Sequence, residues 1–136
     1  MRNDSLLSPP FAQPPVASLY ERLGGESALM AAVPLFYQKV LADPLVSPFF
    51  LKLDMEGQIQ KQISFMSRAF GGPIEYAGRD LRSSHAHMVE RGLSDAHFDA
   101  IARHLKATLE ELGIAEGMIG ETLALVETTR SQVLGR

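Results

Sequence analysis

The chain has 136 residues and a mass of 14.9 kDa, 46% of its residues are hydrophobic, and it contains no cysteine. This size suits one domain with a substantial core, and the lack of cysteine excludes disulfides, iron–sulfur clusters and thiolate zinc sites. The formal net charge is -3 and the basic residues are scattered, so the sequence predicts no nucleic-acid partner.

Residues 1–17 differ in composition from the rest of the chain. They hold four of the eight prolines, and their apolar stretch is too short for a secretory signal. No apolar run approaches the roughly 18 residues that a membrane-spanning helix needs. We therefore expect a disordered, Pro-rich extension over residues 1–17, one folded domain over residues 18–136, and a cytoplasmic protein with no membrane partner.

The first part of the domain predicts two helices. A short one covers residues 18–23 and stops at Gly24-Gly25, since glycine tolerates the positive φ of a tight corner. The next covers residues 26–41 and ends before Asp43-Pro44. Pro34 lies inside it and lacks an N–H donor, so we expect a bend just before that proline. The buried face of this helix is predicted to contain Leu29, Val33, Phe36, Tyr37, Val40 and Leu41.

Four further helices are predicted downstream. The third begins after an Asp54 N-cap and runs to Phe70, before Gly71-Gly72-Pro73, and a loop then leads to about Asp80. The fourth ends at Gly92, the fifth starts at a Ser94 or Asp95 cap and ends at Gly113, and the last covers residues 115–134. Because 3.6-residue apolar stripes occur throughout and period-2 alternation is missing, the predicted class is all-α. The stripe of the fifth helix comprises Phe98, Ile101, Ala102, Leu105, Leu109 and Leu112, and that of the last comprises Ile119, Thr122, Leu123, Val126 and Val133.

His85 is predicted to point inward from an apolar helical face. It recurs with Leu81, Met88 and Val89 at the spacing of one helical stripe, whereas His87 faces elsewhere. A neutral imidazole among apolar side chains, with one ring nitrogen free, is what a haem iron needs as an axial ligand. The alternative is a core histidine that donates to a backbone carbonyl.

A polar set on the third helix is the second candidate for function. Gln58, Lys61, Gln62 and Phe65 share one face, while Ile59, Ile63, Met66 and Phe70 mark an apolar side. Taken alone, the polar face is also compatible with a solvated surface.

The other histidines do not predict a metal site. His97 and His104 lie on one helix at seven residues' separation, about 10.5 Å along the axis, so they cannot share one ion. His97, near a helix start, is expected to be structural. No HExxH pair, Ser-His-Asp set, phosphate loop or dinucleotide fingerprint occurs.

From about residue 18 to the C-terminus, the sequence resembles the group I truncated haemoglobins. Each short motif is weak alone, but their order and spacing together are specific. The motifs are Leu19-Tyr-Glu-Arg-Leu-Gly-Gly25, Phe36-Tyr37, Asp43-Pro44 with Phe49-Phe50, Asp54-Met55, Gln58 and Gln62, Ala69-Phe-Gly-Gly72, Gly78-Arg79, Arg82-Ser-Ser-His85 and His97-Phe98-Asp99.

The resemblance implies a two-over-two helical sandwich that encloses haem b, iron protoporphyrin IX. It makes His85 the proximal iron ligand and Tyr37, Gln58 and Gln62 the hydrogen-bond donors to a bound gas, dioxygen above all and nitric oxide or carbon monoxide as well. Lys61 is a candidate sixth iron ligand; alternatively its stem covers the haem edge. The implied haem contacts are Phe50, Gln58, Lys61, Phe65, Tyr76, Arg79, Leu81, His85 and Phe98.

Three functional hypotheses remain open at the level of sequence. The first is reversible dioxygen binding. The second is a nitric oxide dioxygenase or a Lys61-ligated redox haem protein, either of which would need a separate reductase, because the chain has no flavin or nicotinamide motif. The third is a helical interaction domain without a cofactor.

Overall fold

The computed structural model describes the backbone of residues 17–71 and 78–136 and the side chains of residues 17–71 and 81–136. All regular structure in these ranges is helical, which confirms the predicted all-α class. The elements are α1 (Leu19–Leu23), α2 (Gly25–Leu41), the short 3-10 helix η2 (Ser47–Phe50), α3 (Met55–Ala69), α4 (Gly78–Glu90), α5 (Asp95–Glu111), α6 (Glu116–Glu127) and α7 (Arg130–Val133).

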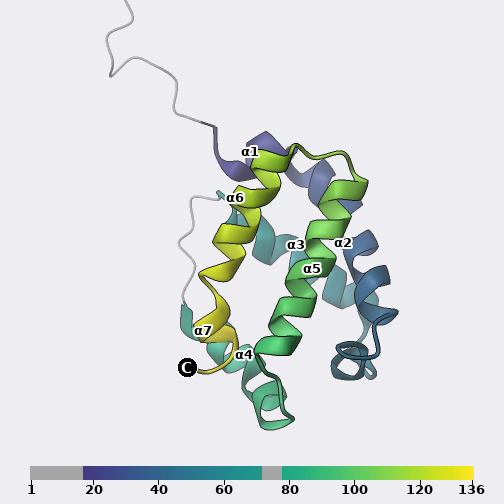
Figure 1. The fold of residues 1–136 in the computed structure, drawn as a ribbon, viewed down its shortest axis with the longest axis vertical. Coiled ribbons are helices and arrows are strands. Elements are labelled where there is room, and N and C mark those ends of the chain that lie inside the picture. Colours follow the sequence, from purple (N-terminus) through teal and green to yellow (C-terminus); the bar gives the residue numbers. More distant parts are fainter. Residues whose placement is uncertain (1–16, 72–77) are drawn as a thin grey trace, which may run out of the picture.

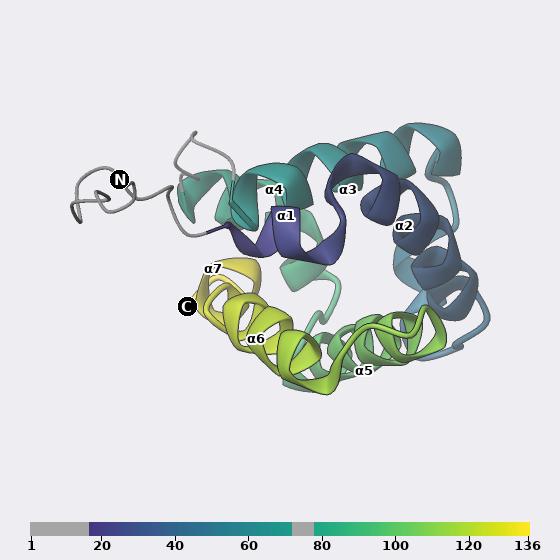
Figure 2. The same ribbon diagram turned by 90° about the horizontal axis from the view of Figure 1, so that it is seen from above.

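The helices form two layers that α2 joins. α5 and α6 run side by side in one layer, and α3 lies in the other, while α2 packs against both α3 and α5 (Figure 2). α4 packs against α7, and both lie at the end of the molecule away from α1 (Figure 1). No helix among the described residues is both long and apolar enough to cross a membrane.

The main core is built around one face of α2. Leu29, Val33, Phe36, Tyr37 and Val40 are all at most 5% exposed, as their spacing predicts. Residues from α1, α3, α5 and α6 pack around them. The predicted end of two stripes is wrong: Leu41 is 43% exposed and Leu112 is 37% exposed. Leu41 is the last residue of α2, and Leu112 is the C-cap of α5, so both lie at the C-terminal end of their helix.

α2 continues through Pro34 from Gly25 to Leu41. Before it, Gly24 and Gly25 have φ values of 118° and 69°, so the predicted glycine corner between the first two helices is confirmed. Asp54 occupies the N-cap position of α3, but its side chain makes no capping hydrogen bond.

The prediction of one continuous helix over residues 115–134 is wrong. α6 ends at Glu127, and α7 begins at Arg130. Between them, the Thr128 and Thr129 hydroxyls donate over 2.6 Å to carbonyls three residues earlier, and their N–H groups bond to the same two carbonyls. These side-chain bonds favour a tight 3-10 turn over continued α-helix, because threonine competes locally for backbone groups.

The turn after α2 is held by Asp43. Its carboxylate accepts the Leu45 N–H over 2.9 Å and lies 2.7 Å from His104 Nε2 on α5. The bond from Leu45 contributes most to lowering the pKa of Asp43, followed by the bond with His104. The segment that leads to η2 is thereby attached to α5.

Candidate functional site

Tyr37 lies near the C-terminal end of α2, and its side chain is 4% exposed. Its ring centroid is 5.1 Å from that of Phe36 and 5.8 Å from that of Phe50, which meets it edge-on. Phe50 belongs to η2, so the turn held by Asp43 brings this aromatic ring against the tyrosine. The Tyr37 hydroxyl is thus positioned by an aromatic cluster.

Gln58 on α3 reaches the hydroxyl of Tyr37. Its amide Nε2 donates to Tyr37 Oη over 3.2 Å. Burial raises the pKa of Tyr37, and the bond from Gln58 partly offsets that rise, so the phenol is protonated at neutral pH. Because the oxygen accepts from Gln58, the hydroxyl hydrogen is free to donate, and none of the described residues accepts it.

The other residues on the predicted polar face of α3 are buried to different extents. Gln62 and Phe65 are half-buried, and Phe65 packs against the main core, whereas Lys61 is exposed. Among the described residues, none forms a hydrogen bond with the Gln62 amide or an ion pair with Lys61. Gln62 therefore offers an unused donor one turn after Gln58.

His85 lies in the middle of α4 and is half-buried. Its Nδ1 is 2.8 Å from the carbonyl oxygen of Leu81, one turn earlier, and 3.2 Å from Ser84 Oγ. Since a carbonyl only accepts, the ring proton is assigned to Nδ1, which donates to Leu81 and leaves Nε2 unprotonated. No side chain in the described ranges bonds to Nε2.

Burial lowers the pKa of His85, and the charge of His87 adds to this effect, while the bond to Leu81 opposes it. The ring is therefore neutral at neutral pH. A neutral imidazole with its Nδ1–H fixed by a carbonyl and its Nε2 lone pair free has the tautomer of a metal-ligating histidine. The described residues contain no group of three His, Asp or Glu side chains that could hold an ion. His85 is thus suited to be the one protein ligand of a metal ion that a cofactor holds.

Three buried apolar residues of α4, α5 and the C-terminal segment lie outside the main core. Leu81, Phe98 and Leu134 are 7%, 7% and 6% exposed, and they are not part of the core cluster around α2. On α4 itself, Met88 is half-buried and His87 is exposed, as the predicted stripe requires. Leu81 lies one turn before His85 on α4, so this part of the surroundings of His85 is apolar. Two implied haem contacts are not tested: Tyr76 and the side chain of Arg79 lie outside the described residues.

The other histidines have structural roles. His97 Nδ1 accepts the N–H of Ser94 over 2.9 Å, which identifies Ser94 as the cap of α5 and agrees with the structural role expected of His97. His104 pairs with Asp43 as described above. His87 is exposed on α4. His97 and His104 are half-buried like His85, but His97 Nδ1 accepts from Ser94 and His104 Nε2 pairs with Asp43. Of the four imidazoles, His85 alone therefore has Nδ1 bonded to a backbone carbonyl and Nε2 without a partner among the described residues.

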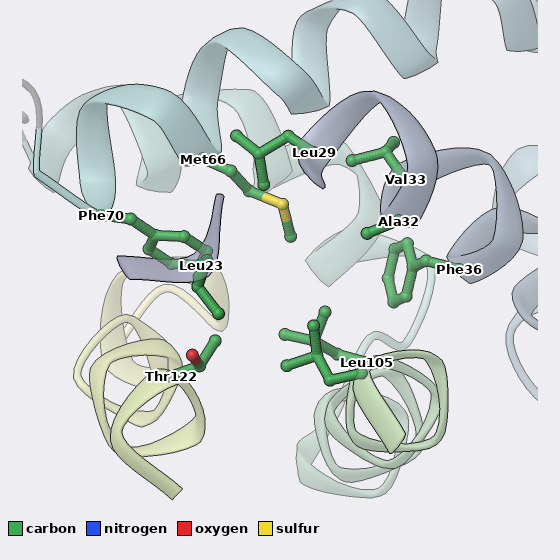
Figure 3. A pocket seen from close by; sticks show the side chains of 10 residues that line it. Leu23, Leu29, Ala32, Val33, Phe36, Met66, Phe70, Leu105 and Thr122 are labelled. Atoms are coloured by element: carbon green, nitrogen blue, oxygen red, sulfur yellow. The ribbon is translucent and has the colours of Figure 1, made fainter. Parts of the chain in front are cut away.

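A small apolar cavity lies in the main core, lined by residues of α1, α2, α3, α5 and α6 (Figure 3). Its volume is about 20 Å³, which is enough for one molecule of the size of water. Met66 and Phe70 of α3 project toward it, opposite Leu105 of α5 (Figure 3). The predicted site residues do not line it. The complete lining is Leu23, Leu29, Ala32, Val33, Phe36, Met66, Phe70, Leu105, Leu109 and Thr122.

One contact between the two sides of the fold was not anticipated from sequence. Arg91, in the turn after α4, lies with its guanidinium carbon 5.2 Å from the ring centroid of Phe49 and donates to the Pro48 carbonyl over 3.1 Å. The Phe49 ring also meets that of His97 edge-on at 5.1 Å. η2 is therefore tied to the turn between α4 and α5. The only signal in the sequence was the Phe49-Phe50 pair, of which Phe50 alone was assigned a role.

Comparison with known proteins gives one consistent family. The model of the family described as bacterial-like globin matches residues 18–134. A group 1 truncated haemoglobin of Chlamydomonas moewusii is 48% identical over 117 residues, which cover 86% of this chain and 68% of that protein. A group 1 truncated haemoglobin of Tetrahymena pyriformis is 45% identical over 119 residues, which cover 88% of this chain and 96% of that protein.

The solved structures that resemble this chain belong to the same family of proteins. The 2/2 haemoglobin of Synechococcus sp. PCC 7002, solved in the cyanomet state with covalently attached haem, superposes with a TM-score of 0.83 at 48% identity, covering 88% of this chain and all of that one. The Fe(III) form of the Tetrahymena pyriformis protein superposes with a TM-score of 0.79 at 45% identity, over 88% of this chain and all of that one. The neighbours share the two-over-two architecture that the sequence predicted. Variants of the Tetrahymena protein with one tyrosine or either of two glutamines replaced have also been solved.

Proposed function

This chain belongs to the bacterial-like globins, as a group 1 truncated haemoglobin, and from that premise we propose that His85 would hold haem b and that the protein binds dioxygen or another diatomic gas. Ferrous haem supplies an iron atom with one coordination position open to a gas. The side chains of the protein would hold the haem and stabilise the bound gas.

The observation that carries the proposal is the state of His85. Its Nδ1–H is engaged by the Leu81 carbonyl over 2.8 Å, so the lone pair of Nε2 is the available donor. Burial lowers its pKa, which keeps that lone pair unprotonated at neutral pH. Leu81, buried one turn before it, supplies apolar surface next to it, and the resemblance makes the buried ring of Phe98 a further contact of the porphyrin.

Tyr37 and Gln58 supply the polar side of the site. The hydroxyl of Tyr37 keeps its hydrogen, because its oxygen already accepts from Gln58, and it can donate that hydrogen to a gas ligand. Gln62 offers a second donor one turn along α3. The tyrosine and the two glutamines replaced in the Tetrahymena variants follow one another at intervals of 21 and four residues, as Tyr37, Gln58 and Gln62 do here. This agreement supports a shared role.

The test is optical. Purified protein mixed with one equivalent of haem should develop an intense Soret band, and the reduced form should change its spectrum when dioxygen or carbon monoxide is added and change back when the gas is removed. A protein that gains no Soret band, or whose reduced spectrum ignores both gases, would contradict the proposal. Rapid formation of nitrate when the oxygenated protein meets nitric oxide, with re-reduction by a cell extract, would instead establish the dioxygenase.

Lys61 is expected not to ligate the iron. Its side chain is exposed on α3, so ligation would require it to leave solvent and turn toward the haem. The ferric protein should therefore be high-spin at neutral pH, with the same spectrum in wild type and in Lys61→Ala. A low-spin wild type that becomes high-spin in Lys61→Ala, but not in the exposed-lysine control Lys52→Ala, would establish lysine ligation.

A further inference from the structure

Arg130, the first residue of α7, is held by three carboxylates. Its Nη1 lies 3.0 Å from Asp95 Oδ1, its Nη2 lies 2.5 Å from Asp99 Oδ1, and its Nε lies 2.6 Å from Glu127 Oε2. Only 20% of the Arg130 side chain is exposed, whereas each carboxylate partner is at least half exposed. The guanidinium is thus the enclosed centre of the cluster, and its partners come from two helices, α5 and α6.

The same guanidinium covers an aromatic ring of the proposed haem site. Its central carbon lies 4.5 Å from the ring centroid of Phe98. Phe98 is 7% exposed and lies outside the main core cluster. A planar guanidinium that stacks on a ring while its edges bind carboxylates restricts that ring in a way that a lysine ammonium does not.

The rest of the C-terminal segment reaches α4. Arg136 forks onto Asp95 over 2.9 and 3.0 Å, and its carbonyl oxygen accepts from Arg82 Nη2 of α4 over 3.0 Å. Between these arginines, Leu134 is buried. We call residues 130–136 the C-terminal clasp. It touches α5 through Asp95 and Asp99 and touches α4 through Arg82, at the end of the molecule where α4 and α7 lie together (Figure 1).

We propose that Arg130 is a positioning residue for the haem site: it fixes the Phe98 ring of α5, and through the C-terminal clasp it holds α4, which carries His85, in a fixed relation to α5. This inference rests on the proposed function, because it concerns the wall on the His85 side of the haem. The charges agree with it, since Arg136 and Arg130 together lower the pKa of Asp95, and Arg130 lowers that of Glu127. An isolated surface ion pair contributes little, but an enclosed arginine with several partners contributes more.

The test compares two arginines of the same protein. Arg130→Met removes the centre of the cluster, and Arg22→Met removes a matched bidentate pair, Arg22 with Glu121, which joins α1 to α6 away from α4. Haem loss to an excess of an apoglobin acceptor should be about tenfold faster in Arg130→Met and within about twofold of wild type in Arg22→Met. Arg130→Lys should fall between wild type and Arg130→Met, because it restores the charge but not the planar fork.

Two further readouts separate positioning from a general loss of stability. The iron–histidine stretching band of the reduced protein should shift or broaden in Arg130→Met and stay in place in Arg22→Met. Wild-type haem loss should accelerate in about 1 M salt, where the Debye length is about 3 Å, and Arg130→Met should show a smaller salt effect. If Arg130→Met fails to fold, the effect of salt on haem loss from the wild-type protein still tests the clasp.

Hydrogen exchange of the full-length chain distinguishes a failed clasp from a failed haem assignment. Amides of α4 should exchange faster in Arg130→Met than in Arg22→Met, with or without haem. If wild type binds no haem, the proposed function fails while this exchange result still decides whether the clasp holds α4. If haem binds, but α4 exchange and haem loss are alike in Arg130→Met and Arg22→Met, the clasp is overturned.

Discussion

Replacing His85 with alanine should abolish iron ligation by the protein. The expected result is loss of the sharp Soret band, or its replacement by the broad spectrum of non-specifically bound haem, because His87 is exposed and His97 and His104 are engaged by Ser94 and Asp43. The fold should survive in the apo form, because His85 is half-buried on α4 and its bonds among the described residues, to the Leu81 carbonyl and the Ser84 hydroxyl, stay within its own helix. Titration of the apoprotein with haem, followed by absorption, measures the effect.

His87→Ala is the matched control. It lies two residues further along α4, is exposed, and should leave the haem spectrum unchanged. Added imidazole should restore a ligated spectrum to His85→Ala, since the small molecule can occupy the space left by the side chain. A normal spectrum in His85→Ala without imidazole would mean that the iron is ligated from elsewhere and would remove the basis of the proposed function.

Replacing Tyr37 with phenylalanine should accelerate dioxygen release by about tenfold. The estimate follows from the loss of one donor, worth about 0.5–1.5 kcal/mol in the neutral case, in a buried setting where its bond is stronger. The ring contacts with Phe36 and Phe50 remain, so the expected change in stability is small. Stopped-flow displacement of dioxygen by carbon monoxide measures the release rate.

Three comparisons make this prediction specific. Tyr20→Phe, a hydroxyl removed from the partly buried edge of the core, should not change the release rate. Carbon monoxide release should respond less than dioxygen release, because carbon monoxide is the poorer hydrogen-bond acceptor. In a double-mutant cycle with Gln58→Leu the two effects should not add, since Gln58 donates to the Tyr37 hydroxyl over 3.2 Å. Additive effects, or an unchanged rate in Tyr37→Phe, would contradict the assigned donor.

Sequence patterns were sufficient wherever the deciding contact lies within one helix. Apolar spacing placed Leu29, Val33 and Phe36 on the buried side of α2, and it placed His85 on the same side of α4 as Leu81. The pattern failed at helix ends, where Leu41 and Leu112 are exposed. It also missed the break between α6 and α7, where two threonine hydroxyls compete for backbone carbonyls.

The identity of the candidate ligand, His85, and the bond that orients it were both accessible from the chain alone, because a helix brings residue i to the carbonyl of residue i−4 whatever surrounds it. The partners of Tyr37, Asp43 and Arg130 were not, since Gln58, His104 and Asp95 lie 21, 61 and 35 residues away from them. Helical periodicity determines which residues share a face, but it does not determine which faces meet. That depends on how helices cross and how the turns between them close, and here those crossings produce both the Tyr37–Gln58 pair and the C-terminal clasp.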